Sequence, residues 1–148
     1  MSTRGRIGVK LPDGKIKSIY VHFDAYKEGV GKTLTKHYTD PKKVEDLIAL
    51  GDISVLGTFY DKELAKKSWE KQYDKEWQES EEGKKASEMT LPYSDRGEDC
   101  PPRIDEDETA FMASIGQCWE DYAYLYKKDY NGIYRWHIME TPYFKELD

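Results

Sequence analysis

The sequence predicts an α+β domain: a mostly antiparallel sheet of about five strands, with helices packed on one face and a charged helical insertion. Hairpin signals occur near both ends of the chain, as Pro-Asp-Gly at 12–14 and Asn-Gly at 131–132. Segments with helical spacing of apolar residues lie between these two signals. The length of 148 residues, without an internal repeat, favours a single domain over 1–148.

The first hairpin is predicted over residues 6–23, around the Pro-Asp-Gly turn. Proline fixes φ in such a turn, and glycine supplies a positive φ. Strand alternation places the apolar side chains at 19, 21 and 23 on the face toward the core. Tyr20 and His22 then share the other face, and Asp24 follows where the strand ends.

Two helices are expected after this hairpin. A short one covers 31–37, and the second begins with Asp40 as N-cap and Pro41 in its first turn. An apolar stripe at i, i+3 and i+4 starts at Val44, and Gly51 is suited to end the helix in the left-handed region.

Residues 61–88 form a charged segment with seven lysines and nine acidic residues. Trp69, Tyr73 and Trp77 recur there at four-residue spacing. This pattern predicts a long, mostly solvated helix with one narrow aromatic ridge. The ridge either packs on the domain's own sheet or binds a partner as a helix with anchors at i, i+4 and i+8.

The last third of the chain returns to strands. We expect a strand at 89–93, then a helix that starts at Asp105, then a hairpin with strands at 122–127 and 133–139. If the strands at both ends of the chain belong to one sheet, residues 6–24 and 121–126 meet across it.

The charge of the chain disfavours generic nucleic-acid binding, because the net charge is −6 and phosphate contacts require a basic face. Residues 95–108 hold seven acidic residues against two arginines. Within this stretch, Asp105, Glu106 and Asp107 either mimic DNA phosphates to a partner protein or cap a solvated helix start.

Cysteine usage and hydropathy indicate a soluble protein of a reducing cytosol. Cys100 and Cys118 have no metal-ligand spacing, and no run of about 18 apolar residues occurs. The first residues lack the apolar segment of a signal peptide. No metal, cofactor or membrane contact is predicted.

Two motif blocks carry a resemblance to a known family. The first block contains Arg-Ile-Gly-Val at 6–9, Ile-Tyr-Val-His-Phe-Asp at 19–24 and Gly-Val-Gly-Lys-Thr-Leu at 29–34. The second contains Ser-Asp-Arg-Gly-Glu at 94–98 and Asp-Tyr-Ala-Tyr-Leu-Tyr at 121–126. Together they resemble a family of short proteins of tailed bacteriophages. That family usually has arginine where this chain has Ser94, and Asp-Gly-Tyr-Pro where it has Asp-Ala-Tyr-Lys.

The resemblance implies a non-enzymatic accessory or counter-defence protein in the cytoplasm of an infected bacterium. Such a protein would bind and block a host or defence-system protein. The candidate partner-binding residues are the aromatic ridge and the acidic stretch, namely Trp69, Tyr73, Trp77, Asp105, Glu106 and Asp107. Tryptophan and tyrosine are favoured anchors at interfaces.

Two alternatives stay open. The first is an oligomeric sponge that sequesters a nucleotide-like anion, with basic groups for phosphate and tyrosines for base stacking. Its candidate residues are Arg4, Arg6, Tyr20, His22, Asp24, Tyr26, Lys32, Tyr38 and Arg96. The second is a small hydrolase in which Asp24 orients His22 as a general base. Walker-type nucleotide hydrolysis is excluded, because Tyr26 stands where the P-loop pattern before Gly-Lys-Thr requires glycine.

Overall fold

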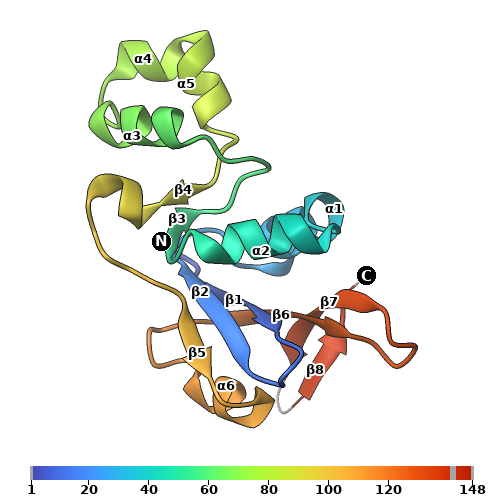
Figure 1. Cartoon of the computed structure of the whole chain (residues 1–148). Helices are drawn as coiled ribbons and strands as arrows, with labels where there is room; N and C mark the ends of the chain where they lie inside the picture. The colour runs from blue at the N-terminus through green and yellow to red at the C-terminus, as the bar shows by residue number, and fades with distance from the viewer. Residues whose placement is uncertain (1, 141–142, 148) are drawn as a thin grey trace.

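The computed structural model describes residues 2–140 and 143–147. The protein is an α+β domain built on one mixed sheet, in the order β4-β3-β2-β1-β6-β7-β8, with β5 also paired to β2. Figure 1 shows this sheet below a group of three helices that stands apart from it. The strands are β1 (Gly5–Lys10), β2 (Ile16–Val21), β3 (Ile53–Val55), β4 (Leu91–Pro92), β5 (Arg103–Asp105), β6 (Tyr122–Lys128), β7 (Tyr134–Glu140) and β8 (Tyr143–Glu146).

Six α-helices are described, together with a π-helical turn at Lys27–Gly31 and a 3-10 turn at Tyr93–Arg96. The helices are α1 (Lys32–His37), α2 (Pro41–Ala49), α3 (Lys62–Glu70), α4 (Lys75–Glu79), α5 (Glu81–Ala86) and α6 (Glu108–Ser114). The α2 helix begins as predicted, because the Asp40 side chain accepts a hydrogen bond from the backbone N–H of Lys42.

Both predicted hairpins form, and they are joined directly. Gly14 lies at φ 91° in the β1–β2 turn, and Gly132 lies at φ 79° in the β6–β7 turn. The strand β1 pairs with β2 on one side and with β6, in parallel, on the other. The first motif block therefore meets residues 122–126 of the second in the sheet, as expected, whereas residues 94–98 of the second lie at the 3-10 turn.

The sheet has more strands than predicted and is not wholly antiparallel. The pairings β1–β6 and β2–β3 are parallel. The additional strands β3, β5 and β8 have only three or four residues each, too few for an alternation pattern to stand out. The predicted strand at 89–93 is reduced to Leu91–Pro92.

Helices cover both faces of the sheet, so the prediction of one covered face is wrong. The larger core lies under α1 and α2 and includes Ile7, Ile19 and Tyr124. On the opposite face, Phe111 of α6 packs against Ile16 and Leu125. The physical reason is that β2 and β6 carry apolar residues on both faces, which demands a second layer.

The predicted helix start at Asp105 is also wrong. Main-chain pairing of Asp105 with Ile16 places it in β5 instead. Asp107 is the true N-cap, since its side chain accepts a hydrogen bond from the N–H of Ala110. The helix α6 therefore begins at Glu108.

The insertion consists of three short helices and not one long helix. Asp61, Asp74 and Ser80 each accept a hydrogen bond from the backbone at a helix start, which divides the segment into α3, α4 and α5. A Cβ atom at Gly83 would lie 2.0 Å from the carbonyl oxygen of Trp77, so the fold there requires glycine. Charge and helical content are as predicted, but the shape is not.

The aromatic ridge predicted for this segment does not exist. Trp69 is buried inside the protein, whereas Tyr73 is 91% exposed in the turn after α3. Trp77 is half-buried, and its indole N–H donates to the carboxylate of Glu82. Because the helix breaks at Asp74, the four-residue spacing no longer places the three rings on one face.

Trp69 fastens the insertion to the sheet. Its indole N–H donates to the carbonyl oxygen of Pro92 at 2.8 Å, and its ring stacks on that of Tyr93 with 5.8 Å between centroids. The Arg96 guanidinium lies 4.4 Å from the centre of the Trp69 ring and pairs with Glu98. The Arg-Gly-Glu motif is thus part of a structural junction.

We predict that Trp69→Ala lowers the free energy of unfolding by about 3 kcal/mol, because it removes a buried indole together with its hydrogen bond. Urea unfolding monitored by circular dichroism measures this change. Tyr73→Ala is the matched control and should change the free energy by less than about 0.5 kcal/mol, since Tyr73 is exposed. Equal effects of the two substitutions would contradict the junction.

Candidate functional site

Four of the residues predicted for an anion site lie together on the α6 face of the sheet. Arg6 pairs with Tyr20 across β1 and β2, and alternation carries the same face to Arg4 and His22. The backbone of Arg4 also accepts a hydrogen bond from the N–H of Asp121. Arg4 therefore lies beside the end of β2 and the start of β6.

Arg6 is committed to an internal ion pair. Its side chain is buried, and Nε lies 3.0 Å from Oε2 of Glu120, whose side chain is also buried. A second guanidinium nitrogen donates to the hydroxyl of Ser18. A charged group held in this way is paired inside the protein and does not present itself to a ligand.

Glu120 also fixes the loop before β6. Its other oxygen, Oε1, accepts hydrogen bonds from the backbone N–H groups of Gly116 and Cys118. Burial by itself raises the pKa of Glu120, but the hydrogen bonds from Arg6 and Cys118 and the charge of Arg6 outweigh this effect, and the pKa is lowered. Glu120 is therefore ionised at neutral pH and holds the loop as a carboxylate.

The loop held by Glu120 displays Trp119. Trp119 lies at φ 65°, in the left-handed region that non-glycine residues rarely adopt, and is 76% exposed. Both features are unfavourable for a large apolar residue, with backbone strain of about 1–2 kcal/mol. The contacts of Glu120 keep the loop in this conformation.

Tyr20 and His22 form a hydrogen-bonded pair next to Arg4. The Tyr20 hydroxyl lies 2.7 Å from Nδ1 of His22. Burial raises the pKa of Tyr20 despite the lowering effect of Arg4, and burial together with the Arg4 charge lowers the pKa of His22. A neutral His22 that accepts the hydrogen bond of the Tyr20 hydroxyl at Nδ1 carries its own proton at Nε2.

The predicted His22–Asp24 pair is replaced by this tyrosine contact. Asp24 lies at φ 59°, and its carbonyl oxygen accepts a hydrogen bond from the N–H of Val30, so it forms the turn into the next helical segment. The hydrogen-bond partner of His22 is Tyr20 and not a carboxylate.

The other residues predicted for the anion site lie elsewhere. Tyr38 is buried under α2, and its hydroxyl donates to the carbonyl oxygen of Gly57. Arg96 is in the junction with Trp69. Tyr26 and Lys32 are exposed, the first beside the π-helical turn and the second at the start of α1. The nine residues therefore do not form one pocket.

The acidic stretch has mainly structural contacts. Asp105 pairs with Arg103 at 3.1 Å within β5, and Asp107 caps α6. Glu106 is exposed between them. Asp107 thus follows the helix-start interpretation, whereas Asp105 belongs to β5.

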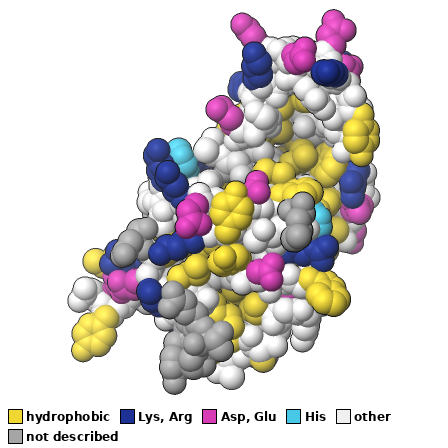
Figure 2. Space-filling model, turned by 180° about the vertical axis from the view of Figure 1, so that it is seen from behind, with side chains coloured by type: hydrophobic (Ala, Val, Ile, Leu, Met, Phe, Trp, Pro, Cys, Tyr) yellow, Lys and Arg dark blue, Asp and Glu magenta, His cyan; other side chains and the backbone are white. Residues whose placement is uncertain are grey.

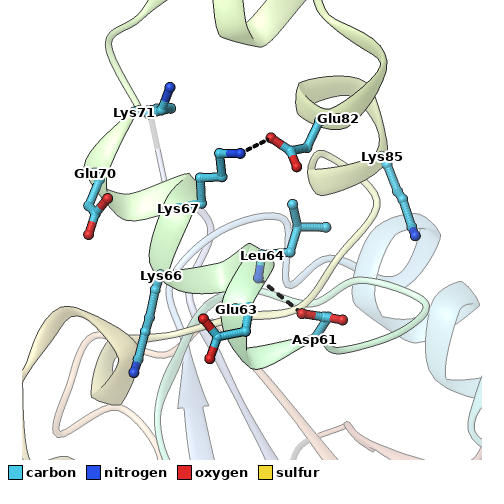
Figure 3. A pocket seen from close by; sticks show the side chains of 9 residues that line it. All are labelled: Asp61, Glu63, Leu64, Lys66, Lys67, Glu70, Lys71, Glu82 and Lys85. Atoms are coloured by element: carbon cyan, nitrogen blue, oxygen red, sulfur yellow. Dashed lines mark hydrogen bonds and ion pairs between the residues drawn. The ribbon is translucent and has the colours of Figure 1, made fainter.

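The insertion carries a charged hollow of about 550 Å³ (Figure 3). Four lysines and four acidic residues line it together with Leu64, and Lys67 is paired with Glu82 at 2.5 Å. Its charges balance, so it selects neither anions nor cations by net charge. The lining residues are Asp61, Glu63, Leu64, Lys66, Lys67, Glu70, Lys71, Glu82 and Lys85.

A candidate binding surface emerges around Arg4, here named the Arg4 patch and defined as Arg4, Tyr20, His22, Phe23 and Trp119. The rings of His22 and Phe23 meet edge to face at 4.5 Å, and Phe23 is 40% exposed. The backbone N–H of Asp121, two residues after Trp119, donates to the carbonyl oxygen of Arg4 at 2.8 Å, which places the Trp119 loop beside Arg4. Hydrophobic side chains gather across the middle of the face seen in Figure 2, with basic groups and histidine among them.

Sequence reasoning missed Trp119. The available signal was a tryptophan between two polar residues directly before a strand, at Cys-Trp-Glu-Asp. Trp119 has a positive φ in a loop that Glu120 holds through backbone hydrogen bonds. Glu120 is in turn paired with Arg6, 114 positions earlier in the sequence.

Two general findings concern metal sites and membrane-spanning helices. Within residues 2–140 and 143–147, no group of three or more His, Cys, Asp or Glu residues is arranged to hold a metal ion. In the same part of the chain, no helix combines the length and apolarity needed to span a bilayer.

Comparison with known proteins adds no relative. No family model, no curated protein and no solved structure matches the chain.

We predict that Glu120→Gln lowers the free energy of unfolding by about 3 kcal/mol at pH 7, because it leaves Arg6 buried without a countercharge. The pKa of Glu120 is lowered in the folded state, so its ionised carboxylate stabilises the fold fully above the unfolded-state pKa of about 4.3. This stabilisation is lost as the pH falls through the folded-state pKa. The difference between wild type and variant should therefore shrink toward pH 3.

Urea unfolding at several pH values measures this difference. Glu98→Gln, which breaks the more exposed pair with Arg96, is the control and should have little effect at any pH. A deficit of Glu120→Gln that stays constant from pH 7 to pH 3 would show that the ionised carboxylate is not responsible.

Proposed function

We propose that this protein is a non-enzymatic binding protein of the bacteriophage accessory type. It acts in the cytoplasm of an infected bacterium, where it binds and blocks a host or defence-system protein. The resemblance of its two motif blocks supports the phage setting. The observation that carries the binding role is the strained, exposed Trp119.

The argument from Trp119 is energetic. An exposed indole in the left-handed region persists only where surrounding contacts enforce it, and such sites cluster at functional surfaces. Here the enforcing group is Glu120, which is itself held by the buried Arg6. A loop backbone held in place before binding loses little entropy on binding, which strengthens affinity.

The composition of the Arg4 patch fits protein recognition. Tryptophan, tyrosine and arginine are the residue types that dominate binding hot spots. Arg4 offers a planar guanidinium to carboxylates, and His22, bonded to Tyr20 through Nδ1, keeps its N–H at Nε2. The partner we propose therefore presents an apolar pocket for Trp119 with carboxylates at its rim.

The alternatives draw less support. The His22–Asp24 hydrolase lacks the hydrogen bond that would orient its base, because His22 is bonded to Tyr20. The nucleotide-like anion hypothesis loses Arg6 to an internal pair, and Tyr38 to the buried core.

We predict that Trp119→Ala weakens partner binding by about thirtyfold, the effect of losing a hot-spot side chain worth about 2 kcal/mol. The tagged wild-type protein is used to capture proteins from a bacterial host. Mass spectrometry identifies them, and the affinity for each purified candidate is then measured by titration. Tyr130→Ala is the matched control, because Tyr130 is fully exposed in the β6–β7 turn.

The proposal requires a candidate whose activity falls on binding and whose affinity depends on Trp119 but not on Tyr130. A candidate that binds both variants equally well would exclude the Arg4 patch. A further outcome is that Trp119 contacts a second copy of this chain. Native mass spectrometry of the purified protein would detect it as a homo-oligomer.

A further inference from the structure

A second candidate site lies on the opposite face of the sheet, around Tyr134. Three adjacent hollows have this side chain in common. The largest, about 410 Å³, lies between the β1–β2 turn, α2 and the β6–β7 hairpin. A smaller one of about 280 Å³ lies on the outer side of the β1–β2 turn. We name the hollows of about 410 Å³ and about 280 Å³ together the Tyr134 groove.

Tyr134 and Tyr126 line the groove and continue inward, with the buried Trp136, as a ladder of three aromatic rings. Trp136 and Tyr126 lie 5.0 Å apart between centroids, and Tyr126 and Tyr134 lie 5.3 Å apart. Each ring is fixed by a hydrogen bond to a backbone carbonyl, from Trp136 to Tyr38, from Tyr126 to Thr39 and from Tyr134 to Lys10. Tyr134 is the outermost ring of the ladder and is half-buried.

The larger hollow is mainly apolar. It is lined by Val9, Leu11, Pro12, Pro41, Ile48 and the two tyrosines, and by the charged residues Lys10, Lys17 and Glu45. Its volume lies within the range of about 300–1,000 Å³ for small-molecule sites. Rigid tyrosine faces and proline rings suit a flat, apolar ring system.

The smaller hollow is basic. Lys10, Lys127 and Lys128 line it, whereas no acidic residue does. Glu108 is shared by Lys10 at 3.3 Å and Lys127 at 2.5 Å, so one carboxylate serves two ammonium groups. Lys128 lies 6.0 Å from the centre of the Tyr134 ring. Lys128 is thus the lysine of this hollow that does not share Glu108, and it lies beside the tyrosine ring.

From this geometry we propose that the Tyr134 groove binds a small planar aromatic anion of the nucleoside phosphate class. The ring lies in the apolar hollow against Tyr134, and the phosphate lies in the basic hollow near Lys128. The two hollows share Lys10, Leu11, Pro12 and Tyr134, so one molecule reaches both. Stacking on tyrosine and ion pairing with lysine are the two interactions by which proteins hold such ligands.

This site is independent of the Arg4 patch. Its apolar hollow lies on the α2 face, whereas Lys10 and Lys127 reach Glu108 at the start of α6, and none of its lining residues belongs to the patch. Loss of partner binding in Trp119→Ala would leave it intact.

The test uses the full chain and four probes: adenosine 5′-monophosphate, adenosine, inorganic phosphate and an acidic peptide. We expect the nucleotide to raise the melting temperature and to shift the backbone amide signals of residues 126–128 and 134 in NMR titrations. Adenosine and phosphate alone should each bind at least about tenfold more weakly, because each fills only one hollow.

Matched variants separate specific binding from general charge. Lys128→Glu should weaken nucleotide binding about tenfold or more, whereas Lys66→Glu, the same change in the charge-balanced hollow of the insertion, should not. Tyr134→Leu should weaken binding, and Tyr134→Phe, which keeps the ring, should retain it. Circular dichroism establishes that each variant is folded.

Three results would overturn the proposal. The first is the lack of any shift with the nucleotide at millimolar concentration. The second is equal weakening by Lys128→Glu and Lys66→Glu, which would mean non-specific attraction. The third is tighter binding of an acidic peptide than of the nucleotide, which would make the groove a protein contact.

Discussion

The buried ion pair between Arg6 and Glu120 is the contact on which the functional surface depends. It joins the first strand to the loop before β6 and is closed by Ser18 and two loop amides. A buried charge without its partner is costly, so neither residue can be lost alone. A contact between residues far apart in the sequence thus fixes the conformation of the loop that exposes Trp119.

The same strand, β1, organises the two faces. Its residues alternate between the α2 core, where Ile7 lies, and the α6 face, where Arg6 lies. The Arg4 patch lies beside the start of β1 on the α6 face, and the apolar hollow of the Tyr134 groove lies against its end, at Val9, on the α2 face. The insertion is attached separately, through Trp69 and the Arg-Gly-Glu motif, which explains why that motif lies at a junction and not in a pocket.

Turn and capping chemistry made much of the fold predictable. Both hairpins and the start of α2 follow from a few residues whose backbone preferences are strong, such as Gly14, Gly132 and Asp40. The aromatic ridge failed because the caps at Asp74 and Ser80 override a four-residue spacing. The candidate site was predictable only in part, since alternation places Tyr20 with His22, but the exposure of Trp119 depends on long-range contacts.

The parallel pairing of β1 with β6 also governs how the chain folds during synthesis. Gly5 pairs with Tyr122, so the first hairpin has an open edge until most of the protein has been made. Contacts between such distant segments are slow to form, and unpaired strand edges promote aggregation meanwhile. Translation that stops before β6 would leave a nascent chain without its central partner strand, a substrate for chaperones or proteases.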